Sequence, residues 1–301
     1  LRNYKSGKFL LWHKSKMANE SKKVVKIAWF GKYFWEEPAL IGNKEQGTGS
    51  IFFSGCNLHC VFCQNYQISQ EGLGKFYSIE DLVNIILRLQ KQGVVSIDLV
   101  TPTIWWQSIK QALILARKRG LKVPVIWNSN AYEDVFALKK MEGLVDVYLP
   151  DFKYGDDKIA WHYSRARDYS SIAFKAIKEM FSQVGLLKIG KDSIAKKGLI
   201  VRHLVLPHNV ENSMRVLDLL AKISKDIHIS LMSQYFPVYK AKEYPEINRR
   251  VTQEEFEKVL DYACSLGFRY GWFQEETDDS LFPDFQRKNP FREVISNFDH
   301  R

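Results

Sequence analysis

Three of the four cysteines in this chain of 301 residues fall within a stretch of eight residues. Cys56, Cys60 and Cys63 follow the pattern Cys-x3-Cys-x2-Cys. A tight loop with this spacing can present three thiolates to three irons of a cubane cluster, which leaves the fourth iron without a protein ligand. A metal site with one open position can bind and transform a small molecule. The spacing therefore predicts a [4Fe–4S] cluster with a reactive, open iron.

Two other interpretations fit a cysteine triplet. A structural zinc site would need a fourth ligand, from His59 or Cys264. Zinc sites are typically built from two separated pairs, and His59 directly adjoins Cys60, so a short loop could hardly direct both at one ion. The thiols could also be inert. We expect Cys264 to be a buried small hydrophobe in an amphipathic helix, outside the site. The clustering indicates a ligand set in a reducing compartment rather than a disulfide framework.

The composition is that of a globular protein, with 46% hydrophobic and 26% charged residues. Since no apolar run approaches the roughly 18 residues of a membrane span, we expect a cytoplasmic protein with no membrane partner. The net charge is +10, but residues 1–26 carry eight Lys and Arg residues and one Glu. We therefore expect a basic, flexible leader over 1–26 and a single domain over 27–301. The leader keeps a nucleic-acid partner open, although the nearly balanced body disfavours it.

Short apolar runs rich in β-branched residues alternate with amphipathic helical stretches. One helix is expected to begin at Ser78, with Asp81 completing a capping box, and to end before Gly93. The expected strands are 50–54, 94–100, 122–127, 145–149, 199–206, 227–232 and 268–273, and the other helices are 104–119, 132–141, 170–184, 212–224 and 252–266. Repeated strand–helix units with continuous apolar strands predict an α/β barrel, full or partial, with helices outside and the chemistry at the carboxyl ends of the strands.

The cysteine loop resembles the radical S-adenosylmethionine (radical SAM) superfamily, whose signature is Cys-x3-Cys-x-aromatic-Cys, with Phe62 as the aromatic residue. The closer resemblance is to the group related to the activating enzyme of pyruvate formate-lyase. The shared motifs are Phe-Trp-Glu-Glu-Pro at 34–38, the cysteine loop at 53–65, Leu-Val-Thr-Pro-Thr at 99–103, Leu-Pro-Asp-Phe-Lys-Tyr at 149–154 and Val-Arg-His-Leu-Val-Leu-Pro at 201–207. The resemblance covers about residues 27–290 and implies a partial (β/α)6 TIM-like barrel.

The same resemblance implies cofactors and site residues. The cofactors are the [4Fe–4S] cluster and S-adenosylmethionine (AdoMet), with flavodoxin or ferredoxin as electron donor. Asp151 and Lys153 would lie near AdoMet, with Lys153 beside its carboxylate; a surface ion pair is the alternative. The amides of Asn128 and Asn130 suit the methionine moiety or the ribose, or else serve a turn. Phe62, as part of the signature, is also expected at the cofactor.

Arg202 and His203 are adjacent in an expected strand, so only one of them should point into the barrel. The resemblance favours His203 near the ribose, and a structural histidine is the alternative. Thr101 stands where the superfamily commonly has Gly-Gly-Glu, so carbonyls or threonine hydroxyls must contact the amino group of AdoMet. Many relatives carry extra N-terminal cysteines, and their absence here argues against an additional metal site.

The leading hypothesis is an enzyme that reductively cleaves AdoMet. The 5′-deoxyadenosyl radical would abstract hydrogen from a glycine in a partner protein, as for activators of glycyl radical enzymes, or from a small molecule. The alternatives are an RNA-modifying radical enzyme and a non-catalytic iron–sulfur or zinc-binding interaction module. Asp151, Lys153 and the Asn-Ser-Asn stretch at 128–130 favour AdoMet binding. Nothing in the sequence names the substrate.

Overall fold

The computed structural model describes residues 24–43, 45–274 and 283–291. Its centre is a sheet in which the strands follow the order β10-β9-β8-β6-β5-β4-β2-β1-β3. The parallel strands are β2 (Thr48–Phe53), β4 (Ile97–Val100), β5 (Val125–Ser129), β6 (Val147–Pro150), β8 (Ala195–Leu204), β9 (His228–Met232) and β10 (Gly271–Gln274). The predicted partial barrel of strand–helix units is confirmed.

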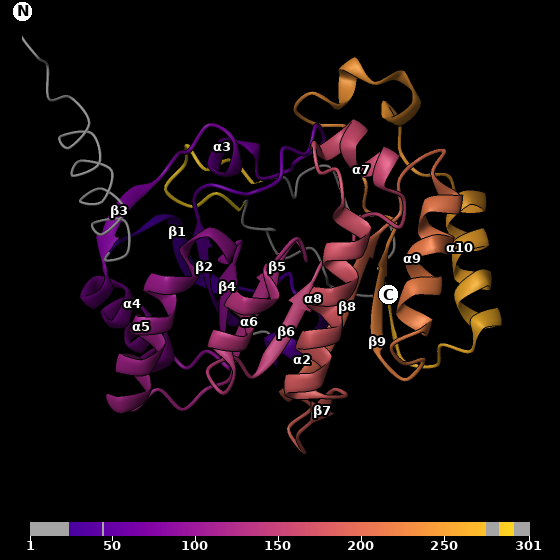
Figure 1. Ribbon diagram of the computed structural model, residues 1–301. Helices are drawn as coiled ribbons and strands as arrows, with labels where there is room; N and C mark the ends of the chain where they lie inside the picture. Colours follow the sequence, from indigo (N-terminus) through magenta and orange to yellow (C-terminus); the bar gives the residue numbers. More distant parts are fainter. Residues whose placement is uncertain (1–23, 44, 275–282, 292–301) are drawn as a thin grey trace, which may run out of the picture.

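Helices cover the outer face of this sheet (Figure 1). They are α4 (Ile79–Lys91), α5 (Trp106–Lys118), α6 (Val135–Met141), α8 (Tyr169–Val184), α9 (Val210–Ala221) and α10 (Gln253–Leu266). The predicted capping box opens α4, because the Ser78 hydroxyl accepts from the backbone of Asp81 and the Asp81 carboxylate accepts from the backbone of Ser78. None of the helices in the described part of the chain is long and apolar enough to cross a membrane.

Several elements were not predicted. Strands β1 (Val24–Tyr33) and β3 (Lys75–Ser78) extend the sheet in antiparallel fashion beyond β2. Because β1 begins at Val24, the last three residues of the expected leader belong to the sheet, while residues 1–23 lie outside the described part. The other additions are α2 (Pro38–Ile41), α3 (Tyr66–Ser69), α7 (Asp157–Ser164), β7 (Lys188–Ile189) and the 3-10 turns Thr103–Trp105, Ala241–Glu243 and Pro245–Ile247.

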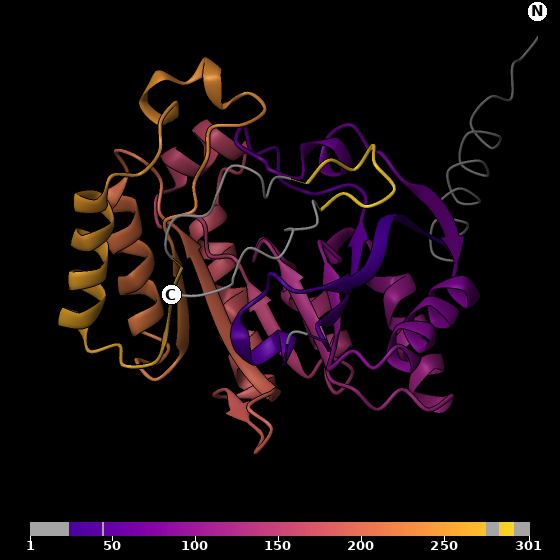
Figure 2. The same ribbon diagram turned by 180° about the vertical axis from the view of Figure 1, so that it is seen from behind.

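The inner face of the sheet is apolar toward the amino ends of the strands. Ala39 and Leu40 of α2 pack there against a small cluster of buried side chains from β5, β6 and β8. These are Ile126, Val147, Leu149, Ala195 and Ile200. Figure 2 shows α2 low on this inner side, whereas the larger helices lie behind the sheet. The helix therefore closes the amino end of the barrel and leaves the carboxyl ends of the strands for polar side chains.

A short stretch near the C-terminus covers another part of the inner face. The Phe285 and Phe291 rings lie 5.6 and 5.3 Å from the Phe52 ring of β2. Gln67 fixes this stretch, since it donates to Asp284 Oδ1 at 3.1 Å and accepts from the Phe285 backbone at 2.7 Å. Residues 283–291 thus pack beside the loop that carries the cysteines.

Candidate functional site

The cysteine loop leaves the carboxyl end of β2 and is held at its base by hydrogen bonds. Gly55 adopts a φ of 90° directly before Cys56, a conformation that favours glycine. The Ser54 hydroxyl donates to the carbonyls of Ile68 and Leu73 at 3.0 and 2.7 Å. The indole of Trp105 donates to the Ser54 carbonyl at 2.8 Å. The base of the loop is therefore fixed relative to the sheet.

Each of the three sulfurs has a polar partner. Ser164 Oγ donates to Cys60 Sγ at 2.9 Å, Asn130 Nδ2 donates to Cys56 Sγ at 3.3 Å, and Ser69 Oγ lies 3.2 Å from Cys63 Sγ. Burial raises the pKa of the Cys60 thiol to about 12, so a thiolate there needs a bound cation such as iron. Hydrogen bonds to cysteine sulfur tune the potential of an iron–sulfur cluster. The loop thus fits the predicted cluster.

The residues considered as a fourth zinc ligand do not join the loop sulfurs. His59 is exposed, and its Nδ1 lies 2.8 Å from Gln70 Oε1. Cys264 is exposed on α10, so the expectation that it is buried is wrong, although it does lie outside the site. Among the described residues, no three His, Cys, Asp or Glu side chains converge on one ion. A cubane does not need such convergence, because each thiolate binds a different iron.

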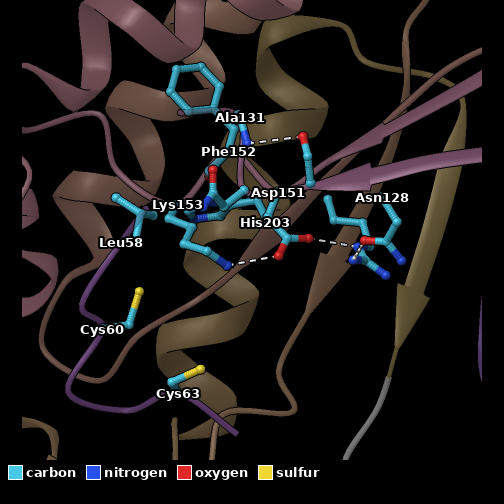
Figure 3. Close-up of polar contacts among 12 residues, drawn as sticks. Leu58, Cys60, Cys63, Asn128, Ala131, Asp151, Phe152, Lys153 and His203 are labelled. Atoms are coloured by element: carbon cyan, nitrogen blue, oxygen red, sulfur yellow. Dashed lines mark hydrogen bonds and ion pairs between the residues drawn. The ribbon is translucent and has the colours of Figure 1, made fainter. Parts of the chain in front are cut away.

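Lys153 and Asp151 lie beside the cysteines, just beyond β6 (Figure 3). Lys153 Nζ is 2.8 Å from Asp151 Oδ2, and Arg202 Nε is 2.7 Å from Asp151 Oδ1. Burial acts to raise the pKa of Asp151, but the charges of Arg202 and Lys153 outweigh it and bring the pKa to about 2. The Lys153 charge also acts to lower the pKa of all three cysteines, which places it close to them. The site therefore holds a fixed ion pair next to the sulfurs.

The asparagines and Thr101 occupy the neighbouring strand ends. Asn128 points inward from β5, accepting from Arg202 Nη2 at 2.6 Å and donating to Glu36 Oε1 at 3.3 Å. Asn130 instead contacts the cysteine loop through Cys56. Thr101 has a φ of 58°, and its backbone N–H donates to the Asn128 carbonyl at 2.9 Å. A β-branched residue in this region of φ is strained, and such strain is typical of functional loops.

Phe62 and His203 are both buried. Neither side chain is exposed on the inner face, where a contact with AdoMet would require it. Phe62 is buried in an apolar group, with ring centroids 5.6 Å from Tyr235 and 6.3 Å from Tyr163. His203 points outward toward the helices, where its Nδ1 lies 2.7 Å from the Phe152 carbonyl and its Nε2 lies 2.8 Å from Ser213 Oγ. His203 therefore has the environment of the structural histidine given above as the alternative, because Arg202 takes the inner side of β8. An AdoMet contact by Phe62 stays a prediction.

The buried position of His203 predicts a pH effect on stability. Burial lowers the pKa of His203 to about 4, below the value of about 6.5 for a free histidine. Between these values the unfolded chain binds the additional proton, so the stability from this group is present above pH 6.5 and is lost as the pH falls toward 4. We expect a loss of about 3 kcal/mol from this group. Urea unfolding at pH 7 and pH 4 should show a smaller loss for His203→Gln, and an equal loss in both proteins would contradict the assignment.

Sequence reasoning missed an acidic group on the inner face. Glu36 Oε2 lies 2.9 Å from Arg202 Nη1, and Glu37 is fully buried beside it. Asp98, from β4, accepts from Ser50 Oγ at 3.1 Å, and burial raises its pKa to about 7. Two signals were available in the sequence: paired acids before the proline that begins α2, and one acid inside an apolar strand.

Comparison with known proteins places the site in a family. The sequence profile of the Radical SAM superfamily matches residues 50–232, which is more than half of the chain and includes the cysteine loop, Lys153 and Arg202. The chain belongs to the radical SAM superfamily. Radical SAM proteins use a [4Fe–4S] cluster and AdoMet, as predicted here from the spacing and the shared motifs.

Individual proteins are similar to this chain in sequence or in fold. An uncharacterized protein of Methanocaldococcus jannaschii is 35% identical over 224 residues, which are 71% of this chain and 61% of that protein. SuiB of Streptococcus suis, solved with AdoMet, aligns over 73% of this chain and 48% of its own chain, with a TM-score of 0.52 and 17% identity. Methylornithine synthase (PylB) aligns over 75% and 65%, with a TM-score of 0.52 and 14% identity. The two structures show a shared fold. The chain spans less than two thirds of each relative's length.

Proposed function

We propose that this radical SAM protein reductively cleaves AdoMet and directs the 5′-deoxyadenosyl radical to a hydrogen atom of its substrate. The observation that carries the proposal is the Asp151–Lys153 pair, fixed beside three hydrogen-bonded cysteines at the carboxyl ends of the strands. The cluster would supply the electron for cleavage and, through its open iron, a binding position for AdoMet.

The residues around the pair support this assignment. Lys153 carries a positive charge that can neutralise the carboxylate of AdoMet, while Asp151 can accept from its ammonium. Arg202 anchors Asp151 from the opposite side, so the carboxylate keeps its orientation when Lys153 turns to a ligand. The Asn128 and Asn130 amides lie on either side of this pair, one toward Arg202 and one toward Cys56. We assign them to positioning of AdoMet.

For the substrate, we propose a glycine in a partner protein, as in activators of glycyl radical enzymes. The support is the set of motifs shared with the group of the pyruvate formate-lyase activating enzyme. An open groove of about 900 Å³ next to the cysteine loop, lined by residues such as Tyr66, Phe236 and Tyr239, suits an extended peptide. A related use of a peptide is seen in SuiB, which was solved with its precursor peptide SuiA. The RNA-modifying alternative depends on the basic leader and stays a prediction.

The test is anaerobic reconstitution with iron and sulfide, followed by AdoMet and dithionite. We expect 5′-deoxyadenosine to form, as measured by chromatography, and to be absent when iron, AdoMet or dithionite is omitted. A brown protein that binds AdoMet without cleaving it would favour the interaction module. A colourless protein with stoichiometric zinc would contradict both radical interpretations.

The substrate class needs its own experiment. The reconstituted protein is incubated with AdoMet, reductant and a glycyl radical enzyme from the same genome. We expect an electron paramagnetic resonance signal of a glycine radical that depends on this protein. Formation of 5′-deoxyadenosine without such a signal would retain the radical chemistry and contradict the protein substrate.

A further inference from the structure

Unpartnered polar atoms occur in more than one part of the inner side of the barrel. Within the described residues, the buried side-chain atoms without a hydrogen bond are Glu37 Oε1 and Oε2, Asp98 Oδ1, His228 Nδ1 and Ser230 Oγ. Asp98 alternates with outward-facing Ile97 and Leu99, and Ser230 alternates with outward-facing Ile229 and Leu231. Buried polar atoms are normally paired, so the unpartnered oxygens of Glu37 and Asp98 call for a missing partner.

Among these residues, Glu37 lacks the most hydrogen-bond partners. Its side chain is fully buried, and neither carboxylate oxygen has a partner. Its charge acts on Glu36, Asp98 and Arg202, so all three lie within electrostatic range of the carboxylate. Arg202 is bound to Glu36, Asp151 and Asn128, and it makes no hydrogen bond to Glu37. An unpaired buried carboxylate costs free energy, which a cationic hydrogen-bond donor would recover.

Asp98 lies deeper in the barrel than Asp151 and Lys153, with the Asn128 side chain next to it. Asp98 precedes Thr101, at the carboxyl end of β4, by three residues, or about 10 Å along a strand. Lys153 and Asp151 lie beyond the end of β6, next to the sulfurs. The exposed fraction of the side chain falls from the carboxyl ends of the strands into the barrel, from 22% for Asp151 to 16% for Arg202 and 6% for Glu36. Glu37 and Asp98, the acidic pair, therefore lie nearer to the amino ends of the strands than Asp151 and Lys153.

We propose that this acidic pair, Glu37 and Asp98, binds a cationic nitrogen of the substrate, an ammonium or guanidinium group. The proposal rests on the function proposed above and adds a substrate property. Several N–H donors on one cation can satisfy both Glu37 oxygens and Asp98 Oδ1. A metal ion suits the pair less well, because no three His, Cys, Asp or Glu side chains of the described residues converge on one ion. On a protein substrate, the cation would be a Lys or Arg side chain near the reacting glycine.

The experiment measures binding of small probes to the reconstituted protein saturated with AdoMet, without reductant. The probes are n-butylamine, n-butylguanidine, 1-butanol and butyrate, and the readouts are dissociation constants by titration and melting temperatures. We expect the cationic probes to bind at least tenfold more tightly than 1-butanol, and this preference to disappear in Glu37→Gln. Glu133→Gln is the matched control, because Glu133 is also buried but accepts from Trp127 and Thr103 on the outer side. The cation preference should persist in it.

A second measurement needs no ligand. Removing an unpartnered buried charge should raise the melting temperature of Glu37→Gln by about 2 °C or more, whereas a structural role predicts a decrease. Asp98→Asn gives the same test if Glu37→Gln does not fold, since its amide oxygen can still accept from Ser50. Equal binding of 1-butanol and n-butylamine overturns the proposal. So does a response to Mg²⁺ or Ca²⁺ in place of the amines, or a loss of AdoMet affinity in Glu37→Gln without any cation preference.

These outcomes are distinct from failure of the proposed function. If the wild-type protein cleaves AdoMet but shows no cation preference, only the acidic pair has been wrongly assigned. If it does not cleave AdoMet, the proposed function fails whatever the probes show.

Discussion

Replacement of Arg202 by methionine is expected to lower the free energy of unfolding by about 3–5 kcal/mol. Arg202 lies within 2.9 Å of Glu36, 2.7 Å of Asp151 and 2.6 Å of Asn128, and only 16% of its side chain is exposed. Without it, two carboxylates stay buried and lose their main compensating charge. Urea unfolding of the apo-protein at pH 7, followed by circular dichroism, measures the change.

Two further variants decide whether buried charge is the cause. Arg119→Met removes an exposed guanidinium that pairs with Glu80, and we expect little change in stability from it. Adding Glu36→Gln to Arg202→Met should recover part of the loss, because one of the two stranded charges is then removed. A loss for Arg202→Met as small as that for Arg119→Met would mean that the inner face is well solvated. The inference about Glu37 and Asp98 would then lose its physical basis.

The parts of the site that the sequence predicted correctly depend on local spacing. Cys56, Cys60 and Cys63 form one loop, so their proximity needed no tertiary information. Asp151 and Lys153 follow a strand directly, and the carboxyl ends of parallel strands meet at one edge. The placement of Asn128 on the inner face follows from the same rule, although β5 extends two residues beyond the predicted end at 127.

The orientation of β8 could not be predicted in this way. Leu199 and Val201 share a face with His203, whereas Ile200 and Leu204 share a face with Arg202, so both faces look equally apolar in the sequence. Strands buried on both sides carry no alternation that fixes their phase. The phase is decided by partners distant in sequence, namely Asp151 on one side and Ser213 on the other.

The acidic group was missed for a related reason. Glu36 and Glu37 belong to a segment before α2, and only tertiary packing places this segment inside the barrel. In the sequence, two adjacent glutamates before a proline are typical of an exposed helix start. Asp98 was overlooked because one acid does not disturb the apolar pattern of 94–100.

Replacement of Cys60 by alanine is expected to abolish formation of 5′-deoxyadenosine and to lower the iron bound after reconstitution. Cys60 is 7% exposed, and the other two thiols cannot hold the cluster with the same geometry. The loss of activity should exceed the 10–100-fold that removal of an outer hydrogen-bond partner typically costs. Ser164→Ala, which removes the hydroxyl that donates to Cys60 Sγ at 2.9 Å, should therefore give a milder, intermediate loss.

Cys264→Ala is the matched control, because it removes the one cysteine outside the loop, exposed on α10. Iron content and 5′-deoxyadenosine formation should equal those of the wild type. The loss of iron and activity should thus be largest for Cys60→Ala, smaller for Ser164→Ala and absent for Cys264→Ala. This order separates a cluster ligand from a thiol that only contributes to packing. Loss of packing would lower the stability of Cys60→Ala and leave the iron content of the folded fraction unchanged. Full iron content and cleavage in Cys60→Ala would show that the loop is not the ligand set, and the proposed radical chemistry would lose its metal site.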